Sequence, residues 1–427
     1  MSELKEKVRE MKGAAMELAA SPLSIRNEAL KRIGESLEKN REKIFEENRK
    51  DLAFAEENGI EQAVRKRLKF DEGKLQASLA GLKSLIELPD PVGEVTLKRE
   101  LDEGLILRRV SCPIGVIGVI FEARPDALIQ ISALCLKSGN CAVLKGGKET
   151  ANSNRILFSL IYEAAKAAGL PEGCLLQAES HSEIDELLTM DREVDLLIPR
   201  GSNAFVRHIM ENTKIPVLGH ADGICHIYVD RAADQEAAIP ILLDAKTQYT
   251  AACNAVETIL VHREIAPEFL PKLAKAMKEA GVALRCTSKE AEWLTEAGSM
   301  KEEEYATEYL SLTASVKVVG SVEEAVSHIN RFGSHHTDCI LTKDDEAADY
   351  FFRMVDSAGV YRNASTRFSD GFRYGFGAEV GISTSKIHAR GPVGLFGLVT
   401  YKYLLEGSGQ TVGDYAEGRK EFHFRDL

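Results

Sequence analysis

The stretch GVIGVIF (Gly115–Phe121) is a continuous apolar run without a single charged or hydrogen-bonding side chain. Short runs of this composition are typical of strands that are buried on both faces. A helical segment follows from Pro125, and a second short apolar run, CAVLK, occupies Cys141–Lys145. A strand, a helix and a second strand in this order predict a parallel pair with a helical crossover. We therefore expect an open α/β sheet, whose ligands bind beyond the carboxyl ends of its strands.

The same alternation of strands and helices continues in two sets. The first set ends with HIYVD (226–230), and the second runs from VETILVH (256–262) to AGVYRN (358–363). Because a single core stops growing near ~250–300 residues, a chain of 427 residues is expected to form more than one domain. The expected limits are residues 1–235 for a cofactor-binding α/β domain, 236–387 for a catalytic α/β domain and 388–427 for a C-terminal return.

A helical region and a β-ribbon precede this alternation. Residues 3–88 show amphipathic helical periodicity, and residues 93–111 resemble a hairpin that turns at Asp102–Gly104. A two-stranded ribbon needs a neighbour to cover its edges, so we predict that a second subunit supplies it. The segment GLFGLVTYKYLLEG (394–407) is predicted to be a strand that joins this ribbon in a homo-oligomer.

Composition excludes several classes of partner. The chain carries 54 Lys and Arg against 66 Asp and Glu, a net charge of −12, which disfavours nucleic acid and anionic membranes. Neither a signal-peptide pattern nor an apolar run of ~20 residues is present, so we expect a cytoplasmic protein. The eight cysteines form no CxxC pair and are expected to be reduced thiols.

Two glycine-containing turns are candidates for anion binding. The dinucleotide fingerprint GxGxxG and the GxxxxGK[ST] phosphate loop are both absent. However, LKGGKETANSN (144–154) follows a predicted strand and offers exposed backbone N–H groups beside two lysines. PRGSN (199–203) repeats the arrangement before another helix. Each turn alone is equally compatible with an ordinary βα connection, whereas two in one sheet favour a nucleotide.

Cys253, in YTAACNAVETILV (249–261), is the candidate nucleophile. Most free cysteines are small buried hydrophobes. Cys253, however, lies between small residues, where a second α/β domain begins and a cleft is expected. The ten histidines show no metal-ligand spacing, and the adjacent pair in GSHHTD (333–338) need not point the same way, so no metal site is predicted. A thiol beside a nucleotide fold suggests covalent capture of an acyl group with hydride transfer.

Four segments resemble one family: Phe121–Glu149, Tyr249–His262, His328–Ile340 and Gly381–Leu395. With the order of elements along the whole chain, they resemble the γ-glutamyl phosphate reductases, the proline-pathway branch of the aldehyde dehydrogenase superfamily. The resemblance implies two open α/β domains with a small β oligomerisation flap. It implies NADPH-dependent reduction of L-glutamyl 5-phosphate to L-glutamate 5-semialdehyde plus phosphate, with glutamate 5-kinase as a possible partner.

The resemblance also assigns roles by position. Cys253 is the nucleophile, and its backbone N–H with the Asn254 side chain would hold the oxyanion. The substrate's amine would meet Asn254 or Glu257. The basic candidates for the substrate's two anionic groups are Arg124, Lys386 and Arg390. The positions assigned to the cofactor are Lys145, Gly146, Lys148, Gly201, Ser202 and Glu308.

The sequence departs from the superfamily pattern at the base that activates water, at the oxyanion asparagine and at the residue beside the cofactor's ribose. Where aldehyde-oxidising members carry a general-base glutamate, this chain has VLGHADG (217–223) with His220 near that position. A reductase that receives an acyl phosphate must keep water from its thioester, so the loss of this base fits. The superfamily's oxyanion asparagine is replaced by FEARP (121–125). Lys148 beside a 2′-phosphate would favour NADPH, with Glu149 as the alternative residue at that place.

Two rival functions remain open. The missing hydrolytic base would suit a CoA-acylating aldehyde dehydrogenase equally well. The basic candidates for binding a carboxylate-bearing substrate argue against this function. A catalytically silent oligomeric scaffold would keep only the fold, which the presence of Cys253 and Lys145 disfavours.

Overall fold

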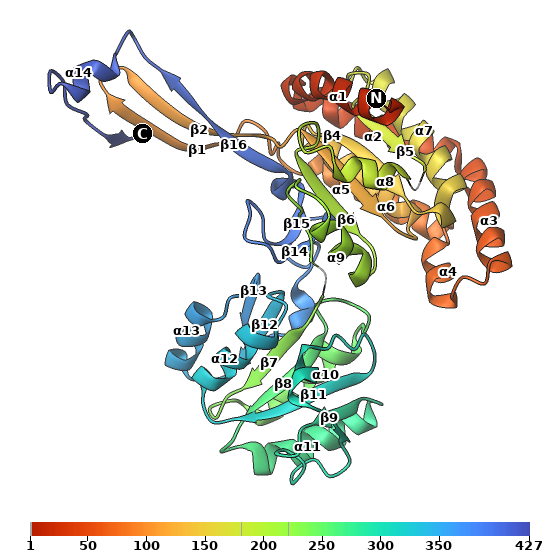
Figure 1. Ribbon diagram of the computed structural model, residues 1–427, viewed down its shortest axis with the longest axis vertical. Helices are drawn as coiled ribbons and strands as arrows, with labels where there is room; N and C mark the ends of the chain where they lie inside the picture. The colour runs from red at the N-terminus through yellow and green to blue at the C-terminus, as the bar shows by residue number, and fades with distance from the viewer. Residues whose placement is uncertain (1, 181, 221) are drawn as a thin grey trace. The chain divides into compact units, whose positions relative to one another are not determined.

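A computed structural model of the chain describes residues 2–180, 182–220 and 222–427. The chain forms two compact units (Figure 1). The first consists of Met1–Leu218, Phe376–Gly381 and Val393–Leu427. The second consists of Gly219–Gly375 and Ile382–Pro392. The chain therefore leaves the first unit near residue 218, and its C-terminal segment returns to that unit.

The first unit begins with amphipathic helices, as predicted for residues 3–88. In α1 (Glu3–Ala20), the buried residues Leu4, Val8 and Met11 recur at the spacing of one helix face. Burying this face stabilises a helix whose other side is charged. The remaining helices of this region are α2 (Leu23–Lys39), α3 (Arg41–Glu57), α4 (Gln62–Leu68) and α5 (Glu72–Glu87).

The strand predicted from GVIGVIF is confirmed as β3 (Val116–Phe121), which is buried at every position. It lies in a parallel sheet of order β5-β4-β3-β6. The crossover helix α6 (Pro125–Lys137) starts with a proline, which suits the first helical turn because no N–H is needed there. The other elements of this layer are β4 (Cys141–Gly146), α7 (Ala151–Ala167), β5 (Leu175–Ala178), α8 (Ser182–Leu188), β6 (Leu196–Arg200) and α9 (Asn203–Glu211).

The predicted hairpin is confirmed as β1 (Val95–Asp102) and β2 (Leu105–Pro113), which pair antiparallel. The edge of β2, however, is covered by β16 (Val399–Glu406) of the same chain. The short β17 (Arg425–Asp426) pairs with β1. Our expectation that a second subunit must supply the neighbouring strand is thus corrected, because the returning C-terminal segment supplies it. Figure 1 shows this flap extending away from the helices of the first unit.

The second unit contains a seven-stranded sheet of order β10-β9-β11-β8-β7-β12-β13, whose neighbours are all parallel. At its centre, β7 (Cys225–Val229) pairs with β8 (Val256–His262) and β12 (Thr337–Leu341). Placing residues 226–230 in the first domain was therefore wrong. The other elements are α10 (Gln235–Thr247), α11 (Ala266–Glu279), β9 (Ala283–Cys286), β10 (Gly298–Ser299), β11 (Thr313–Val319), α12 (Val322–Phe332), α13 (Asp345–Met354) and β13 (Gly359–Arg362).

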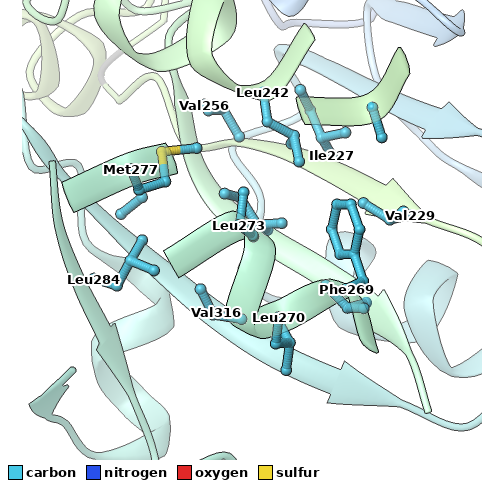
Figure 2. Packing of buried hydrophobic residues seen from close by; sticks show 14 of the residues in the cluster. Ile227, Val229, Leu242, Val256, Phe269, Leu270, Leu273, Met277, Leu284 and Val316 are labelled. Atoms are coloured by element: carbon cyan, nitrogen blue, oxygen red, sulfur yellow. The ribbon is translucent and has the colours of Figure 1, made fainter. Parts of the chain in front are cut away.

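The core of the second unit fixes these strands (Figure 2). Phe269 and Leu273 of α11 are fully buried against apolar residues that include Ile227 and Val256 of the central strands. Each such side chain contributes about 1.5–3 kcal/mol relative to leaving it in water. The loops that precede β7, β8 and β12 are therefore anchored to strands that the buried core holds in place.

The remaining elements are short. They are β14 (Glu379–Ser383), β15 (Gly391–Gly394), α14 (Val412–Ala416), and the 3₁₀ turns η1 (Lys148–Thr150), η2 (Glu302–Ala306), η3 (Thr366–Phe368) and η4 (Leu395–Leu398). Among the helices that the structure describes, none combines the length and the apolar character needed to cross a membrane.

Candidate active site

Three chemically active side chains lie at the amino edge of the second unit's sheet. Cys253 lies shortly before β8, His336 immediately precedes β12, and His220 precedes β7. Because β8, β7 and β12 are parallel neighbours, their amino ends meet at the same edge. Cys253 thus lies at the amino edge of its own sheet, whereas ligands were expected only beyond the carboxyl ends of strands.

The Cys253 thiol has a histidine partner. Its Sγ lies 3.2 Å from Nε2 of His336, a side chain that is 1% exposed. Nδ1 of His336 lies 2.9 Å from the hydroxyl of Thr337, which holds the ring in place. An imidazole nitrogen within hydrogen-bond distance of a thiol can take its proton as sulfur attacks an electrophile. This pair is therefore equipped for nucleophilic catalysis.

His220 completes the cluster. Its ring lies edge-on to that of His336, with 5.1 Å between the centroids. Nδ1 of His220 lies 2.8 Å from the carbonyl oxygen of Ile382. Since a carbonyl only accepts, Nδ1 of His220 carries a proton and donates it to this oxygen. His220 thus lies beside the thiol with one ring nitrogen bound to the backbone.

The other cysteines have environments that suppress reactivity. Cys253 and Cys112 are half-buried, and the remaining six thiols are buried. Burial raises the pKa of Cys135, Cys174 and Cys339 to about 12, because a thiolate is unfavourable in apolar surroundings. Cys253 combines partial exposure with a base, which agrees with its prediction as the nucleophile.

His336 was missed by the sequence analysis, which considered GSHHTD only as a metal pair. The available signal was its position directly before a short apolar strand of the second α/β set. That signal identifies a catalytic partner only when the strand order is known, because β12 is far from β8 in sequence and separated from it by β7 in the sheet.

His220, Cys253 and His336 also offer one ligand atom each, and these atoms all lie within 4.8 Å of one another. Imidazole nitrogen and thiolate sulfur are ligands that Zn²⁺ prefers. A bound Zn²⁺ would occupy the sulfur lone pair that a nucleophile needs, so the two uses of this thiol exclude one another. The expectation of a metal-free catalytic site stays a prediction.

Gly223 lies directly against the backbone of Cys253. A Cβ at this position would overlap the backbone of Cys253, including its Cα and its carbonyl carbon. The thiol of Cys225 lies 3.3 Å from the Cys253 carbonyl oxygen and donates to it. The segment before β7 thus supports the turn that carries Cys253.

We expect Gly223→Ala to lower kcat by about 10²-fold, the usual effect of displacing a reacting group by ~1 Å. The added methyl group overlaps the Cys253 backbone, so the turn must shift and the Sγ–Nε2 geometry with it. Steady-state kinetics and the alkylation rate of Cys253 by iodoacetamide both measure this displacement. Gly13→Ala in α1, where a Cβ meets nothing within 4 Å, is the matched control. Wild-type values for Gly223→Ala would contradict the tight contact.

Asn254 and the nearby backbone bear on oxyanion binding. The Asn254 side chain is buried, and its Nδ2 donates to the carbonyl oxygen of Ser369 at 2.8 Å. One of its amide hydrogens therefore ties the Cys253 turn to the loop at Ser369. Among the described residues, the backbone N–H groups of Cys253 and Asn254 have no acceptor. They are available to the oxyanion that forms on a carbonyl oxygen when the Cys253 sulfur adds to the carbonyl carbon.

Glu257 forms an ion pair within the chain. Its Oε2 accepts from Nζ of Lys246 at 2.6 Å, and both side chains are fully buried. Burial raises the pKa of Glu257 to about 7 and lowers the pKa of Lys246. The half-buried Glu308, assigned to the cofactor, lies in the same unit and adds to the negative charge that Glu257 experiences. Glu257 is thus a buried structural partner of Lys246, which corrects its suggested role.

Two of the predicted substrate anchors share one carboxylate of the chain. Nζ of Lys386 lies 2.6 Å and Nη1 of Arg390 lies 3.1 Å from Asp356. The hydrogen bond from Lys386 is the main cause that lowers the pKa of Asp356, and Arg390 adds to it. Arg124 is exposed at the start of α6, in the first compact unit. The assignment of these residues to the substrate stays a prediction.

The glycine turn after β4 fits a phosphorylated or hydroxylated ligand. Lys145 is 4% exposed, and its Nζ donates to the Gly146 carbonyl oxygen at 2.6 Å. Burial lowers the pKa of Lys145, and no carboxylate among the described residues forms an ion pair with it. A Cβ at Gly146 or Gly147 would overlap the side chain of Asn154 or Glu149, respectively. A buried lysine beside a turn that tolerates no side chain suits the sugar and phosphates of a nucleotide. Lys148 is exposed next to it.

The second predicted anion site already holds a carboxylate of the chain. Oε2 of Glu122 accepts from the backbone N–H of Ser202 at 3.0 Å. A Cβ at Gly201 would overlap the same carboxylate. Binding a cofactor pyrophosphate at the start of α9 would require Glu122 to move, so the turn at Gly146 fits a nucleotide better than the turn at Gly201 does.

The chain matches the family model described as the aldehyde dehydrogenase family over residues 1–315. It is 55% identical to a γ-glutamyl phosphate reductase of Pelotomaculum thermopropionicum over 426 residues, covering 100% of this chain and 98% of the relative. A γ-glutamyl phosphate reductase of Acetivibrio thermocellus is 53% identical, with 97% and 96% covered.

Solved structures agree with this match. The crystal structure of a γ-glutamyl phosphate reductase from Thermotoga maritima superposes with a TM-score of 0.94 at 39% identity, covering 96% of this chain and 100% of that one. An acetylating aldehyde dehydrogenase from Geobacillus thermoglucosidasius superposes with a TM-score of 0.63 at 17% identity, with 96% and 97% covered. The second likeness concerns the fold alone.

Proposed function

Because this chain belongs to the aldehyde dehydrogenase family, we propose that it is a γ-glutamyl phosphate reductase. It reduces L-glutamyl 5-phosphate to L-glutamate 5-semialdehyde with release of phosphate, a step of proline biosynthesis. The observation that carries this proposal is the 3.2 Å contact between the Cys253 thiol and Nε2 of His336. It occurs in a chain that matches enzymes of that name over nearly their full length.

The first chemical step forms a thioester on Cys253. His336 Nε2 takes the thiol proton while Sγ attacks the acyl carbon, and the bond from that carbon to the phosphate oxygen breaks. The oxyanion that forms at this carbon is stabilised by the backbone N–H groups of Cys253 and Asn254. Phosphate leaves, and the acyl group stays on sulfur.

Membership of the family implies a nicotinamide cofactor. When bound, this cofactor supplies the hydride that converts the thioester to the aldehyde. Lys145, Gly146 and the backbone of the turn after β4 would hold it, and the exposed Lys148 would pair with a 2′-phosphate, which makes NADPH the proposed form. On release of the aldehyde, Cys253 returns as thiolate and His336 can restore its proton.

Exclusion of water distinguishes this reaction from aldehyde oxidation. The position near which oxidising members are expected to carry a glutamate base is occupied by His220, whose Nδ1 donates to the backbone of Ile382. With this glutamate replaced, water is expected to attack the thioester slowly, and phosphate is the proposed acceptor in the reverse direction. The same absence would suit transfer to CoA, so the acceptor must be tested directly.

The test runs the reaction in reverse with glutamate 5-semialdehyde and NADP, following the absorbance of the reduced cofactor. We expect reduction of NADP that requires phosphate. Reduction that requires CoA instead would identify the CoA-acylating reaction. Reduction that needs neither acceptor would mean that water completes the reaction, and NADP binding without turnover under all conditions would leave a silent scaffold.

We also propose that the enzyme works as a homo-oligomer assembled through its flap. Strand β16 is an edge strand whose side chains from Thr400 to Glu406 are all exposed, including Tyr401, Tyr403 and Leu405. An exposed apolar edge strand is a template for pairing with another chain. Light scattering of Leu405→Lys beside wild type tests this interface. A glutamate 5-kinase that supplies the labile acyl phosphate remains the proposed partner.

A further inference from the structure

Arg367 is a buried arginine that has no carboxylate partner among the residues that the structure describes. The residue is 8% exposed, in a loop that also contains Ser369. Its Nε donates to Oε1 of Gln248 at 2.9 Å, which is a neutral acceptor. Neither Nη group has a hydrogen-bond or ion-pair partner among the described residues. Most buried charges are paired or ligand-bound, since an isolated one is strongly unfavourable.

The guanidinium of Arg367 belongs to the surroundings of the nucleophile. Its Cζ lies 5.9 Å from the centre of the Tyr249 ring, in the turn that leads to Cys253. Ser369 in turn accepts the amide hydrogen of Asn254. The loop that carries Arg367 thus contacts the Cys253 turn both before the cysteine, at Tyr249, and after it, at Asn254.

The charged groups near Arg367 also place its guanidinium in the electrostatic surroundings of Cys253. Burial is the main cause that lowers the pKa of Arg367, followed by the charge of Arg373, whereas Cys253 raises it. Asp370 and Asp244 also raise it, but neither forms an ion pair with it. Arg373 itself donates to the backbone carbonyl oxygen of Arg367 at 2.5 Å. A cationic position of this kind, close enough to Cys253 to interact with its charge, attracts an anion to the thiol.

We propose that Arg367 is the anchor for an anionic group of the substrate, held by its two Nη groups while Cys253 attacks. This proposal deepens the proposed function, on which the identity of the substrate rests. A guanidinium fork matches the paired oxygens of both a carboxylate and a phosphate. The predicted anchors Lys386 and Arg390 are paired with Asp356, whereas no described carboxylate pairs with Arg367.

The experiment separates the two anions by kinetics in the reverse direction. In Arg367→Lys, which keeps the charge but loses the fork, we expect one of two Michaelis constants to rise about 10- to 100-fold, the effect of losing charge-assisted hydrogen bonds. A rise in the KM for phosphate identifies the phosphate site. A rise in the KM for glutamate 5-semialdehyde, with loss of its preference over butanal, identifies the α-carboxylate site. Unchanged values for both would overturn the proposal.

A second measurement does not depend on turnover. Inorganic phosphate or L-norvaline, which carries the α-carboxylate without a reactive end, is expected to slow the alkylation of Cys253 in wild type but not in Arg367→Gln. The control is Arg362→Gln, whose arginine is paired with Asp345 on the solvent side of the same unit. Protection that persists in Arg367→Gln, or none in wild type, rejects the anchor. Protection without any turnover would instead reject the proposed reaction and keep the anion site.

Discussion

Cys253→Ala is expected to lower the rate of phosphate-dependent oxidation of glutamate 5-semialdehyde by on the order of 10⁴- to 10⁶-fold. Without sulfur no thioester can form, and the chain offers no second thiol in a comparable environment among its described residues. The variant should fold normally, because Cys253 is half-buried in a turn and fills no part of the apolar core. Cofactor reduction in the reverse assay measures the loss, and thermal unfolding checks the fold.

Cys112→Ala provides the matched control for this variant. Cys112 is the other half-buried cysteine, on β2 of the flap, and burial raises the pKa of its thiol. Its removal should leave turnover unchanged. Intact-mass measurement after incubation with the semialdehyde and NADP, without phosphate, should detect an acyl adduct on wild type and Cys112→Ala alone. Turnover by Cys253→Ala within tenfold of wild type would reject the covalent mechanism.

His336→Asn is expected to lower kcat by about 10²- to 10⁴-fold, the usual contribution of a positioned general base. The asparagine amide cannot take the Cys253 proton, although it retains polar character beside the sulfur. Alkylation of Cys253 by iodoacetamide at neutral pH should slow about tenfold or more, because no imidazole then takes the thiol proton as sulfur attacks. A role of His336 in packing alone would change the unfolding temperature without changing this alkylation rate.

His335→Asn tests the neighbouring histidine as the control. His335 has a left-handed backbone with φ of 61°, which asparagine tolerates, and its Nδ1 contacts the backbone oxygen of Asp356 at 2.6 Å. Its ring is thus bound to the backbone of another segment, and its replacement should preserve the alkylation rate of Cys253. Equal losses in the two variants would show that the loop, and not the His336 imidazole, determines the reactivity.

The sequence was sufficient for features that depend on local patterns. The buried run at Gly115–Phe121 became a central strand because its apolar residues leave no polar face for solvent. The glycine turn after Lys145 could be recognised because only residues without Cβ fit its tight contacts. Cys253 was identifiable because small residues surround it where an α/β unit begins.

Tertiary structure alone decided which distant residues meet. The strand order β8-β7-β12 brings His336 to Cys253 across the sheet edge, and no local pattern encodes the order of strands. The loop of Arg367 is likewise joined to the Cys253 turn by a hydrogen bond between residues distant in sequence. Asp356 forms an ion pair with Lys386, so Lys386 is not an unpaired cation. Hydrophobic periodicity determines an element's buried face, whereas these contacts depend on how the elements pack together. This protein's sequence therefore determined its elements and pointed to Cys253, and only the packed sheet placed His336 and Arg367, the proposed base and anion anchor, near that thiol.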